Sequence, residues 1–331
     1  MSKIKTIGIL TSGGDAPGMN AVIRSVVRTA HFGGLNVKGI RQGYAGLLEK
    51  NAIDMDLRSV SGSLHYGGTI LGSARSKEFA QYAGVEQARD NCIALGLDGL
   101  IVAGGDGSFR GARDLSAKGI PCIGIPCTID NNIGCTDYTI GFDTAVNTLV
   151  EIVDKLRDTS QSHSRCSVVE VMGHNSGNIA LYTGICCGAE AILIPEVPSD
   201  IERDVLGKMR KAQSQGKTHF IIIVSEGVTG ERAKQRSMDT QQLADFIEAR
   251  TGVETRATVI GHIQRGGSPN AHDRKVGSLM GNYAVKLLSA GAGSRVVAMR
   301  GDKIVDYDIA DALNMSAAID LKQLQALNEI S

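Results

Sequence analysis

The sequence predicts an α/β protein of two lobes, each a mainly parallel β-sheet flanked by helices. Short apolar segments alternate along the chain with amphipathic segments of helical period. The 331 residues include 41 glycines and no tryptophan, which favours many tight strand-to-helix turns over a large aromatic surface. A chain of this length is also long for one hydrophobic core and comfortable for two.

The N-terminal segment reads as a strand at residues 4–10, a glycine-rich turn at residues 11–18 and an amphipathic helix at residues 21–30. Gly13 and Gly14 let the backbone approach an anion closely, and Pro17 suits the first turn of a helix. We therefore expect phosphate oxygens at the amino end of this helix. A purely structural turn is the alternative.

The same design recurs where an apolar strand at residues 99–103 leads into Gly104-Gly-Asp-Gly-Ser108. Neither turn matches GxxxxGK[ST] or GxGxxG, so the P-loop and dinucleotide fingerprints are absent. Asp106 would repel phosphate unless a cation stood between them. Mg²⁺ bridges carboxylates to phosphates, so the sequence predicts a magnesium ion held by Asp106.

A third apolar strand, residues 123–127, ends in a polar tip that carries Thr128 and Asp130. Ligands of open α/β sheets collect at the carboxyl ends of the strands, so this tip and the turn at residues 104–108 are expected to face one crevice. Another glycine-rich turn ends on Arg75, which could hold a nucleotide phosphate. Its alternative is a solvated surface charge.

Apolar residues recur at three and four residues from Phe142 to Leu156 and predict a long helix that leads into the second lobe. Strands are predicted there at residues 166–171, 219–225 and 257–260, alternating with helices near 203–213 and 240–250. The resulting domain assignment gives residues 1–140 with about 264–310 to a nucleotide-binding lobe, and 141–263 with about 311–331 to a sugar-phosphate-binding lobe.

Polar and basic residues flank the strands of the second lobe. Each alone is more typical of a surface charge, but together they favour a site for a small phosphorylated molecule, and Glu226 would accept hydrogen bonds from sugar hydroxyls. The residues concerned are Arg165, Met172, Gly173, His174, Glu226, Arg256, His262 and Arg265.

Charge and cysteine content narrow the class of protein. Lys plus Arg and Asp plus Glu both number 35, which argues against nucleic acid or an anionic membrane as a partner. The seven cysteines have no CxxC spacing, so buried free thiols are expected. No apolar run approaches the roughly 18 residues of a membrane span, and we expect a cytoplasmic protein.

Five motifs together resemble the bacterial ATP-dependent 6-phosphofructokinase family, with nearly constant spacing from about residue 4 to about residue 310. They are Thr11-Ser-Gly-Gly-Asp-Ala-Pro-Gly-Met-Asn20, Gly104-Gly-Asp-Gly-Ser108, Thr128-Ile-Asp-Asn131, Val168-Val-Glu-Val-Met-Gly173 and Gly261-His-Ile-Gln-Arg-Gly-Gly-Ser-Pro269. The resemblance implies two Rossmann-like lobes and phosphoryl transfer from MgATP to the 1-hydroxyl of fructose 6-phosphate in glycolysis. Lipid and NAD kinases share the Gly-Gly-Asp-Gly element, but the sugar-phosphate cluster disfavours them.

The resemblance also assigns roles to individual residues. Asp130 would accept the hydroxyl proton, Thr128 would contact the sugar near its reacting end, and His174 stands at a catalytic position. The nucleotide would be bound by Gly14, Tyr44, Arg75, Ser76, Gly105, Asp106, Gly107 and Ser108. The sugar phosphate would be bound by Thr128, Asp130 and the second-lobe cluster, with Arg165 and Arg256 reaching in from a neighbouring subunit of a homotetramer.

An effector site for ADP or phosphoenolpyruvate is implied in the same way. Its resembling positions are Arg24, Arg28, Arg157, Gly188, Glu190, Lys217 and His219. Three further positions that are commonly basic in the family are Leu57, Gln215 and Thr218 in this chain. Such losses of charge are expected to weaken the effector site.

Two departures fall at the chemistry itself. Asn132 replaces an aspartate of the family pattern and His174 replaces an arginine, so weaker metal binding and slower turnover are expected. One alternative is therefore a catalytically weak paralogue that acts as a ligand-binding or regulatory subunit. Pyrophosphate as donor is a second alternative, disfavoured because Gly107 and Cys127 replace the bulky charged residues of pyrophosphate-dependent relatives.

Overall fold

The computed structural model describes residues 4–230 and 238–330. It divides into two compact units. The first unit comprises Met1–Ile129, Ile133–Thr144 and Arg265–Ala317, and the second comprises Asp130–Asn132, Ala145–Gln264 and Ala318–Ser331.

The last crossing between the units follows Ala317, later in the chain than the predicted position near residue 310. The reason is the short helix α11 (Ile309–Asn314), whose side chains Ile309 and Ala312 are buried in the core of the first unit. Tertiary burial of a short segment is not visible in its local sequence pattern. The earlier crossing follows Thr144, close to the predicted position near residue 140.

The first unit contains an eight-stranded sheet of order β12-β11-β5-β4-β1-β2-β3, with β6 paired to β5. Only β3 and β12 run antiparallel to their neighbours, so the predicted mainly parallel sheet is confirmed. The strands are β1 (Thr6–Thr11), β2 (Asn36–Ile40), β3 (Ala52–Met55), β4 (Gly99–Gly104), β5 (Cys122–Thr128), β6 (Ile140–Gly141), β11 (Arg295–Arg300) and β12 (Lys303–Asp308).

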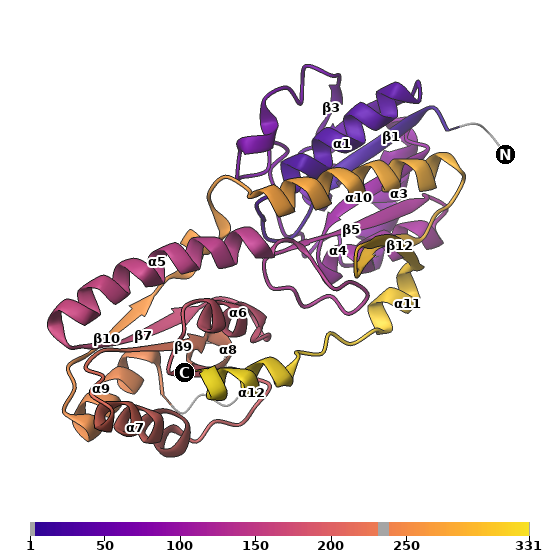
Figure 1. Ribbon diagram of the computed structural model, residues 1–331. Helices are drawn as coiled ribbons and strands as arrows, with labels where there is room; N and C mark the ends of the chain where they lie inside the picture. The colour runs from indigo at the N-terminus through magenta and orange to yellow at the C-terminus, as the bar shows by residue number, and fades with distance from the viewer. Residues whose placement is uncertain (1–3, 231–237, 331) are drawn as a thin grey trace. The chain divides into compact units, whose positions relative to one another are not determined.

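Helices cover both faces of this sheet (Figure 1). Helices α1 (Met19–Phe32) and α10 (Ala271–Ser289) pack together, and Oγ of Ser25 donates a 2.5 Å hydrogen bond to the main-chain oxygen of Ser278. The buried core on the opposite face takes residues from α11 and from α2 (Gly43–Leu48), α3 (Tyr82–Ala94) and α4 (Asp106–Ala117). A 3₁₀ turn at Ser63–His65 completes the unit.

The first residue of helix α1 is Met19, two residues after Pro17. Gly18 is the N-cap, with φ at 103°, and Pro17 therefore precedes the helix. The expectation that Pro17 lies in the first turn is wrong, because the left-handed conformation of Gly18 turns the chain before the helix starts.

The second unit contains a four-stranded, fully parallel sheet of order β10-β7-β9-β8. Its strands are β7 (Cys166–Val171), β8 (Ala191–Leu193), β9 (Phe220–Ser225) and β10 (Thr255–Val259). Its helical segments are α5 (Phe142–His163, starting in the first unit), α6 (Asn178–Cys186), a π-helix (Glu202–Gly207), α7 (Lys208–Ser214), α8 (Glu226–Thr229), α9 (Thr240–Thr251), a 3₁₀-helix (Gly261–Arg265) and α12 (Leu321–Ile330).

Local chemistry explains the ends of several elements. Helix α9 starts with a capping box between Asp239 and Gln242, and ends at Gly252 in the left-handed conformation.

The strand β8 was not predicted because only three residues form it. The predicted helix at 203–213 exists, but its first part is the π-helix.

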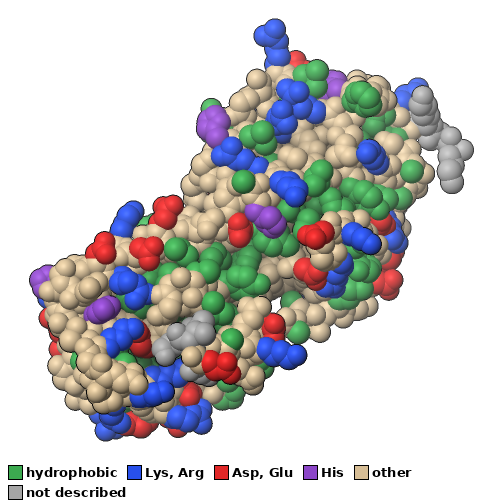
Figure 2. Space-filling model, in the orientation of Figure 1, with side chains coloured by type: hydrophobic (Ala, Val, Ile, Leu, Met, Phe, Trp, Pro, Cys, Tyr) green, Lys and Arg blue, Asp and Glu red, His purple; other side chains and the backbone are tan. Residues whose placement is uncertain are grey.

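The surface shows no large field of one charge on the face drawn in Figure 2, where basic and acidic side chains are interspersed. Among the described residues, no helix is both long enough and apolar enough to cross a membrane. All seven cysteines are free thiols. Cys186 is exposed, which corrects the expectation that every thiol is buried, and burial raises the pKa of Cys92, Cys166 and Cys187 to about 12.

Candidate active site

Three strand ends of the first unit lie side by side. The register pairs Thr11 of β1 with Ala103 of β4, and Gly104 with Pro126 of β5. The main-chain N–H of Ser12 donates to the oxygen of Ala103 at 2.9 Å. Both glycine turns and the strand that leads to Thr128 therefore meet at one sheet edge, as the strand order of an open sheet requires.

The turn at residues 104–108 is built to approach a ligand. Gly104 has no room for a side chain, because an added Cβ would collide with Oγ of Ser108 and the oxygen of Ser12. An added Cβ on Gly105 or Gly107, in contrast, would meet no atom of the described residues within 4 Å. The backbone of this turn thus faces open space at the amino end of α4, where N–H groups favour an anion.

Asp106 is the first residue of α4 and is half-buried. Burial raises the pKa of its carboxyl group, and the guanidinium of Arg110 opposes this effect. A carboxylate beside an open phosphate cradle can hold a hard cation. Among the described residues, no group of three or more His, Cys, Asp or Glu side chains is arranged to hold a metal ion.

Tyr44 packs beneath the protein surface and supports the turn at residues 104–108. Its hydroxyl donates a 2.7 Å hydrogen bond to the main-chain oxygen of Ser108, and its ring stacks on Phe79 with centroids 3.9 Å apart. Only 4% of Tyr44 is exposed. The structure thus gives Tyr44 a supporting position, and its contact with a nucleotide stays a prediction.

Two buried polar residues hold the glycine-rich turn that precedes Arg75. Asn20 donates to the oxygens of Tyr66 and Gly68 at 2.9 and 2.7 Å. The hydroxyl of Thr11 donates to the oxygen of Gly72 at 2.8 Å. The sequence pattern indicates no role for either residue, although both belong to the motif at residues 11–20.

Arg75 and Ser76 follow that turn. Arg75 is exposed, and Oγ of Ser76 accepts from the N–H of Phe79 at 3.0 Å. Oγ of Ser73 donates to the oxygen of Gly13 at 2.6 Å, which ties this segment to the first glycine turn. The structure therefore brings two of the predicted nucleotide-binding turns into contact.

Arg265 lies against the first glycine turn. Its Nη1 donates to the oxygen of Asp15 at 3.0 Å, and an added Cβ on Gly14 would come within 2.6 Å of the same nitrogen. Its guanidinium is thus placed in the first unit, whereas the neighbouring His262 is exposed in the second. The grouping of Arg265 with the sugar-phosphate residues stays a prediction.

The tip beyond β5 is held from two sides. Oγ1 of Thr139 donates to the main-chain oxygen of Thr128 at 2.7 Å. Two residues past this strand end is Asp130, whose segment Asp130–Asn132 clusters with the second unit. There Nδ2 of Asn178 donates to the oxygen of Asn131 at 2.7 Å, and Asn131 has a φ of 45°. A left-handed non-glycine residue is uncommon and marks a segment fixed by its surroundings.

The end of β7 in the second unit carries Met172, Gly173 and His174. Oε1 of Glu226 accepts from the N–H groups of Gly173 and His174 at 3.1 and 2.7 Å. The N–H of Met172 donates to Gln264 at 3.1 Å. Gln264 is fully buried, and sequence analysis missed it because its partner lies 92 residues away.

Arg165 and Arg256 lie at the opposite end of the same strands. Nε of Arg165 is 2.8 Å from Glu254, and Arg256 forms an ion pair with the same carboxylate. Arg165 directly precedes β7 and Arg256 is the second residue of β10. Within one chain the structure therefore separates these cations from Met172, Glu226 and His262, which follow the carboxyl ends of the strands.

Five of the predicted effector residues gather in the second unit. Arg157 donates to the main-chain oxygen of Cys187, next to Gly188, and Lys217 forms an ion pair with buried Glu190. Burial, followed by the charges of Lys217 and Arg157, lowers the pKa of His219. Glu190 and Lys217 also line a cavity of about 560 Å³.

The other two predicted effector residues are in the first unit. Arg24 and Arg28 lie on helix α1, and burial, then the charge of Arg28, lowers the pKa of Arg24. The predicted effector set is thus divided between the two units.

The fold and the strand-end site define a two-lobed α/β protein with two glycine-rich turns at one sheet edge. The family model described as phosphofructokinase matches residues 6–288. An ATP-dependent 6-phosphofructokinase of Alkaliphilus metalliredigens is 48% identical over 99% of this chain and 100% of its own, and one of Finegoldia magna is 50% identical over 94% of each chain.

A solved structure has the same fold. The T-state phosphofructokinase of Pichia pastoris superposes with a TM-score of 0.88 at 34% identity, over 99% of this chain and 39% of that longer one. The chain belongs to the phosphofructokinase family.

Proposed function

We propose that this protein transfers the terminal phosphoryl group of MgATP to the 1-hydroxyl of fructose 6-phosphate, giving fructose 1,6-bisphosphate and ADP. The observation that carries the proposal is the pairing of β4 with β5, because it sets the open turn at residues 104–108 beside the strand that leads to Thr128 and Asp130. Phosphoryl transfer depends on such positioning and on charge stabilisation.

Each part of the site has a role in this proposal. N–H groups of Gly105, Gly107 and Ser108 at the amino end of α4 bind nucleotide phosphate oxygens. Asp130 accepts the proton of the attacking hydroxyl. Glu226 already accepts two N–H groups on Oε1, so sugar hydroxyls are expected to donate to Oε2.

Mg²⁺ is the cofactor that the residues fit, because Asp106 presents a carboxylate beside the open backbone of Gly105 and Gly107. When bound, the ion would neutralise charge on the phosphates. Asp106 would be its protein ligand, and Asn132 would offer an amide oxygen without adding charge.

A homotetramer is the proposed assembly. Arg165 and Arg256 lie at the strand ends away from Met172 and Glu226, so a neighbouring subunit would have to supply them to a 6-phosphate. The proposed effector, ADP or phosphoenolpyruvate, would meet Lys217 and His219 with fewer cations than is common in the family. We expect the protein to act in the cytoplasm.

ATP is the favoured donor. The relatives that match over nearly the whole chain carry ATP-dependent in their names, and Gly107 leaves open space where a larger residue would stand. The similarity to these relatives argues against the alternative that the protein is a non-catalytic paralogue.

A coupled assay of the purified full-length chain tests the function. Fructose 6-phosphate and Mg²⁺ are supplied with either ATP or pyrophosphate, and fructose 1,6-bisphosphate is measured. The proposal expects turnover with ATP well above that with pyrophosphate. Absence of turnover with ATP would overturn it.

A further inference from the structure

Asp273 is a carboxylate with no exposed surface in the first turn of α10. Both of its oxygens accept main-chain N–H groups. Oδ1 accepts from Gly141 at 2.6 Å, and Oδ2 accepts from Thr144 at 2.9 Å and from the Thr144 hydroxyl at 2.5 Å. The hydroxyl of Tyr138 lies 3.3 Å from Oδ1. The mechanism proposed above makes no use of this group.

Three helix amino ends converge on this carboxylate. Asp273 lies in the first turn of its own helix, and Thr144 lies in the first turn of α5. Gly18, the N-cap of α1, is so close that an added Cβ would come within 3.3 Å of Cβ of Asp273. Burial raises the pKa of Asp273, while its hydrogen bonds to Gly141 and Thr144 oppose the shift. Helix amino ends favour a negative charge, so a carboxylate suits this point.

The segment that Asp273 binds contacts the site directly. Gly141 is the β6 residue that pairs with Thr128 of β5, and Thr139 donates to the oxygen of Thr128 at 2.7 Å. On its other side Gly141 packs closely against Ala16 in the turn at residues 11–18. Its φ is 108°, and an added Cβ would come within 2.6 Å of Cβ of Ala16. Strand β6 therefore lies against both the tip of β5 and the turn at residues 11–18.

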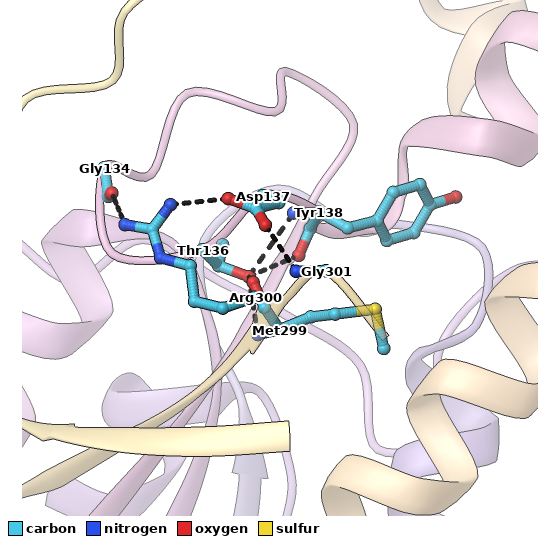
Figure 3. Close-up of polar contacts among 7 residues, drawn as sticks. All are labelled: Gly134, Thr136, Asp137, Tyr138, Met299, Arg300 and Gly301. Carbon is cyan, nitrogen blue, oxygen red and sulfur yellow. Dashed lines mark hydrogen bonds and ion pairs between the residues drawn. The ribbon is translucent and has the colours of Figure 1, made fainter. Parts of the chain in front are cut away.

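A second anchor holds the start of the loop that returns to β6 (Figure 3). Arg300 donates to Asp137 at 2.5 Å and to the oxygen of Gly134 at 2.7 Å, and Oγ1 of Thr136 donates to the oxygen of Tyr138 at 2.8 Å. The ring of Tyr138 points away from this cluster. This anchor is partly exposed, whereas Asp273 is buried and bonds directly to Gly141 of β6.

We propose that Asp273 is a positioning residue for phosphoryl transfer: its carboxylate fixes β6, and β6 fixes the end of β5 at Thr128 beside the first glycine turn. This inference rests on the function proposed above. An amide accepts on one oxygen only, so Asp273→Asn keeps the size of the side chain and loses the hydrogen bond either to Gly141 of β6 or to Thr144 of α5. Loss of either bond lets the side chain shift from the orientation that holds β6.

The test measures kcat, both KM values and thermal stability for four variants of the full-length protein. We expect Asp273→Asn to lower kcat about 10- to 100-fold, because small misplacements at a reacting centre cost this much, with both KM values changed less than about threefold. Thr144→Val is expected to lower kcat in the same direction, and Thr144→Ser, which keeps the hydroxyl, to retain it.

Leu288→Ala is the matched control for stability. Leu288 is fully buried in the last part of α10 and packs against Gly99, at the far end of β4 from the site. It is expected to lower thermal stability while kcat of the folded protein stays within about twofold of the wild-type value.

The experiment distinguishes failure of the proposed function from failure of the inference about Asp273. A wild-type protein without turnover overturns the proposed function and this inference with it. An active wild type, with Asp273→Asn no slower than Leu288→Ala, overturns the inference alone. If Asp273→Asn does not fold, equal kcat in Thr144→Val and Thr144→Ser overturns it.

Discussion

The main-chain N–H of His174 donates a 2.7 Å hydrogen bond to Oε1 of Glu226. This contact fixes the backbone of His174, whose φ is 56°, while its imidazole stays exposed. The side chain at this position can therefore change without loss of the loop conformation. Asn132, the other residue that the resemblance marks as a departure, also keeps some exposure.

His174→Arg combined with Asn132→Asp is expected to raise kcat, because the proposed function assigns both positions to the reaction and the double variant adds a fixed cation and a carboxylate there. A contact of this kind is worth about 3 kcal/mol, or roughly 100-fold in rate, which sets the upper limit of the gain. His174→Gln with Asn132→Asp is the control without the cation. A double variant no faster than wild type would show that other residues already compensate at these positions.

Gly107→Ala is expected to leave the fold intact and to weaken ATP binding at least about tenfold. An added Cβ there would meet no described atom within 4 Å, and alanine stabilises a helix over glycine by about 0.5–1 kcal/mol. The methyl group would instead occupy the space proposed for phosphate. Calorimetric titration with MgATP and thermal unfolding measure the two effects.

Gly111→Ala in the same helix is the matched control. Its Cβ would come within 2.6 Å of Phe79 and 2.8 Å of Tyr44, so it should lower thermal stability. ATP affinity that is unchanged in Gly107→Ala would place the nucleotide elsewhere.

Asp106→Asn is expected to abolish the magnesium-dependent reaction and yet to stabilise the ligand-free protein. Burial raises the pKa of Asp106 in the folded state above its unfolded value, so ionisation of this group opposes folding. The stability gain of the variant should be complete above the raised folded pKa and should vanish below the unfolded value of about 3.9.

Urea denaturation of Asp106→Asn and wild type between about pH 4 and pH 7, without nucleotide or metal, tests the sign. A variant less stable than wild type by the same amount at every pH would contradict a desolvated carboxylate at this position.

If Arg165 of one subunit completes the active site of its neighbour, two inactive variants should complement each other. Arg165→Ser and Asp130→Ser are each expected to be nearly inactive, because one lacks a partner's phosphate ligand and the other lacks the base. In equal mixtures refolded or coexpressed together, about a quarter of the sites would combine an intact Asp130 with an intact neighbouring Arg165. Recovery to about that fraction supports sharing, and no recovery would contradict it.

Much of the fold followed from local patterns. Apolar runs and glycine-rich turns located β1, β4, β5 and the turns at residues 11–18 and 104–108 because a strand and its turn are encoded within about ten residues. The short strand β8 and the helix α11 lacked such a signal. They are ordered by burial against segments distant in sequence.

The supporting residues of the site were the least visible in the sequence. Asp273 meets Gly141 from 132 residues away, and Gln264 meets Met172 from 92 residues away. Motifs identify residues that touch a ligand, whereas positioning residues are defined by partners that only the fold brings together. Arg165 is a case that the sequence did indicate, because the strand predicted at residues 166–171 already separates it from Met172.

The central claim is that the carboxylate of Asp130 accepts the proton of the sugar hydroxyl. The most direct measurement is kcat of Asp130→Ser in the coupled assay, together with the affinity for fructose 6-phosphate. We expect kcat to fall about 10²- to 10⁴-fold, as for loss of a general base, with affinity for fructose 6-phosphate within about threefold of wild type. A variant that retains more than about a few per cent of the wild-type rate would contradict it.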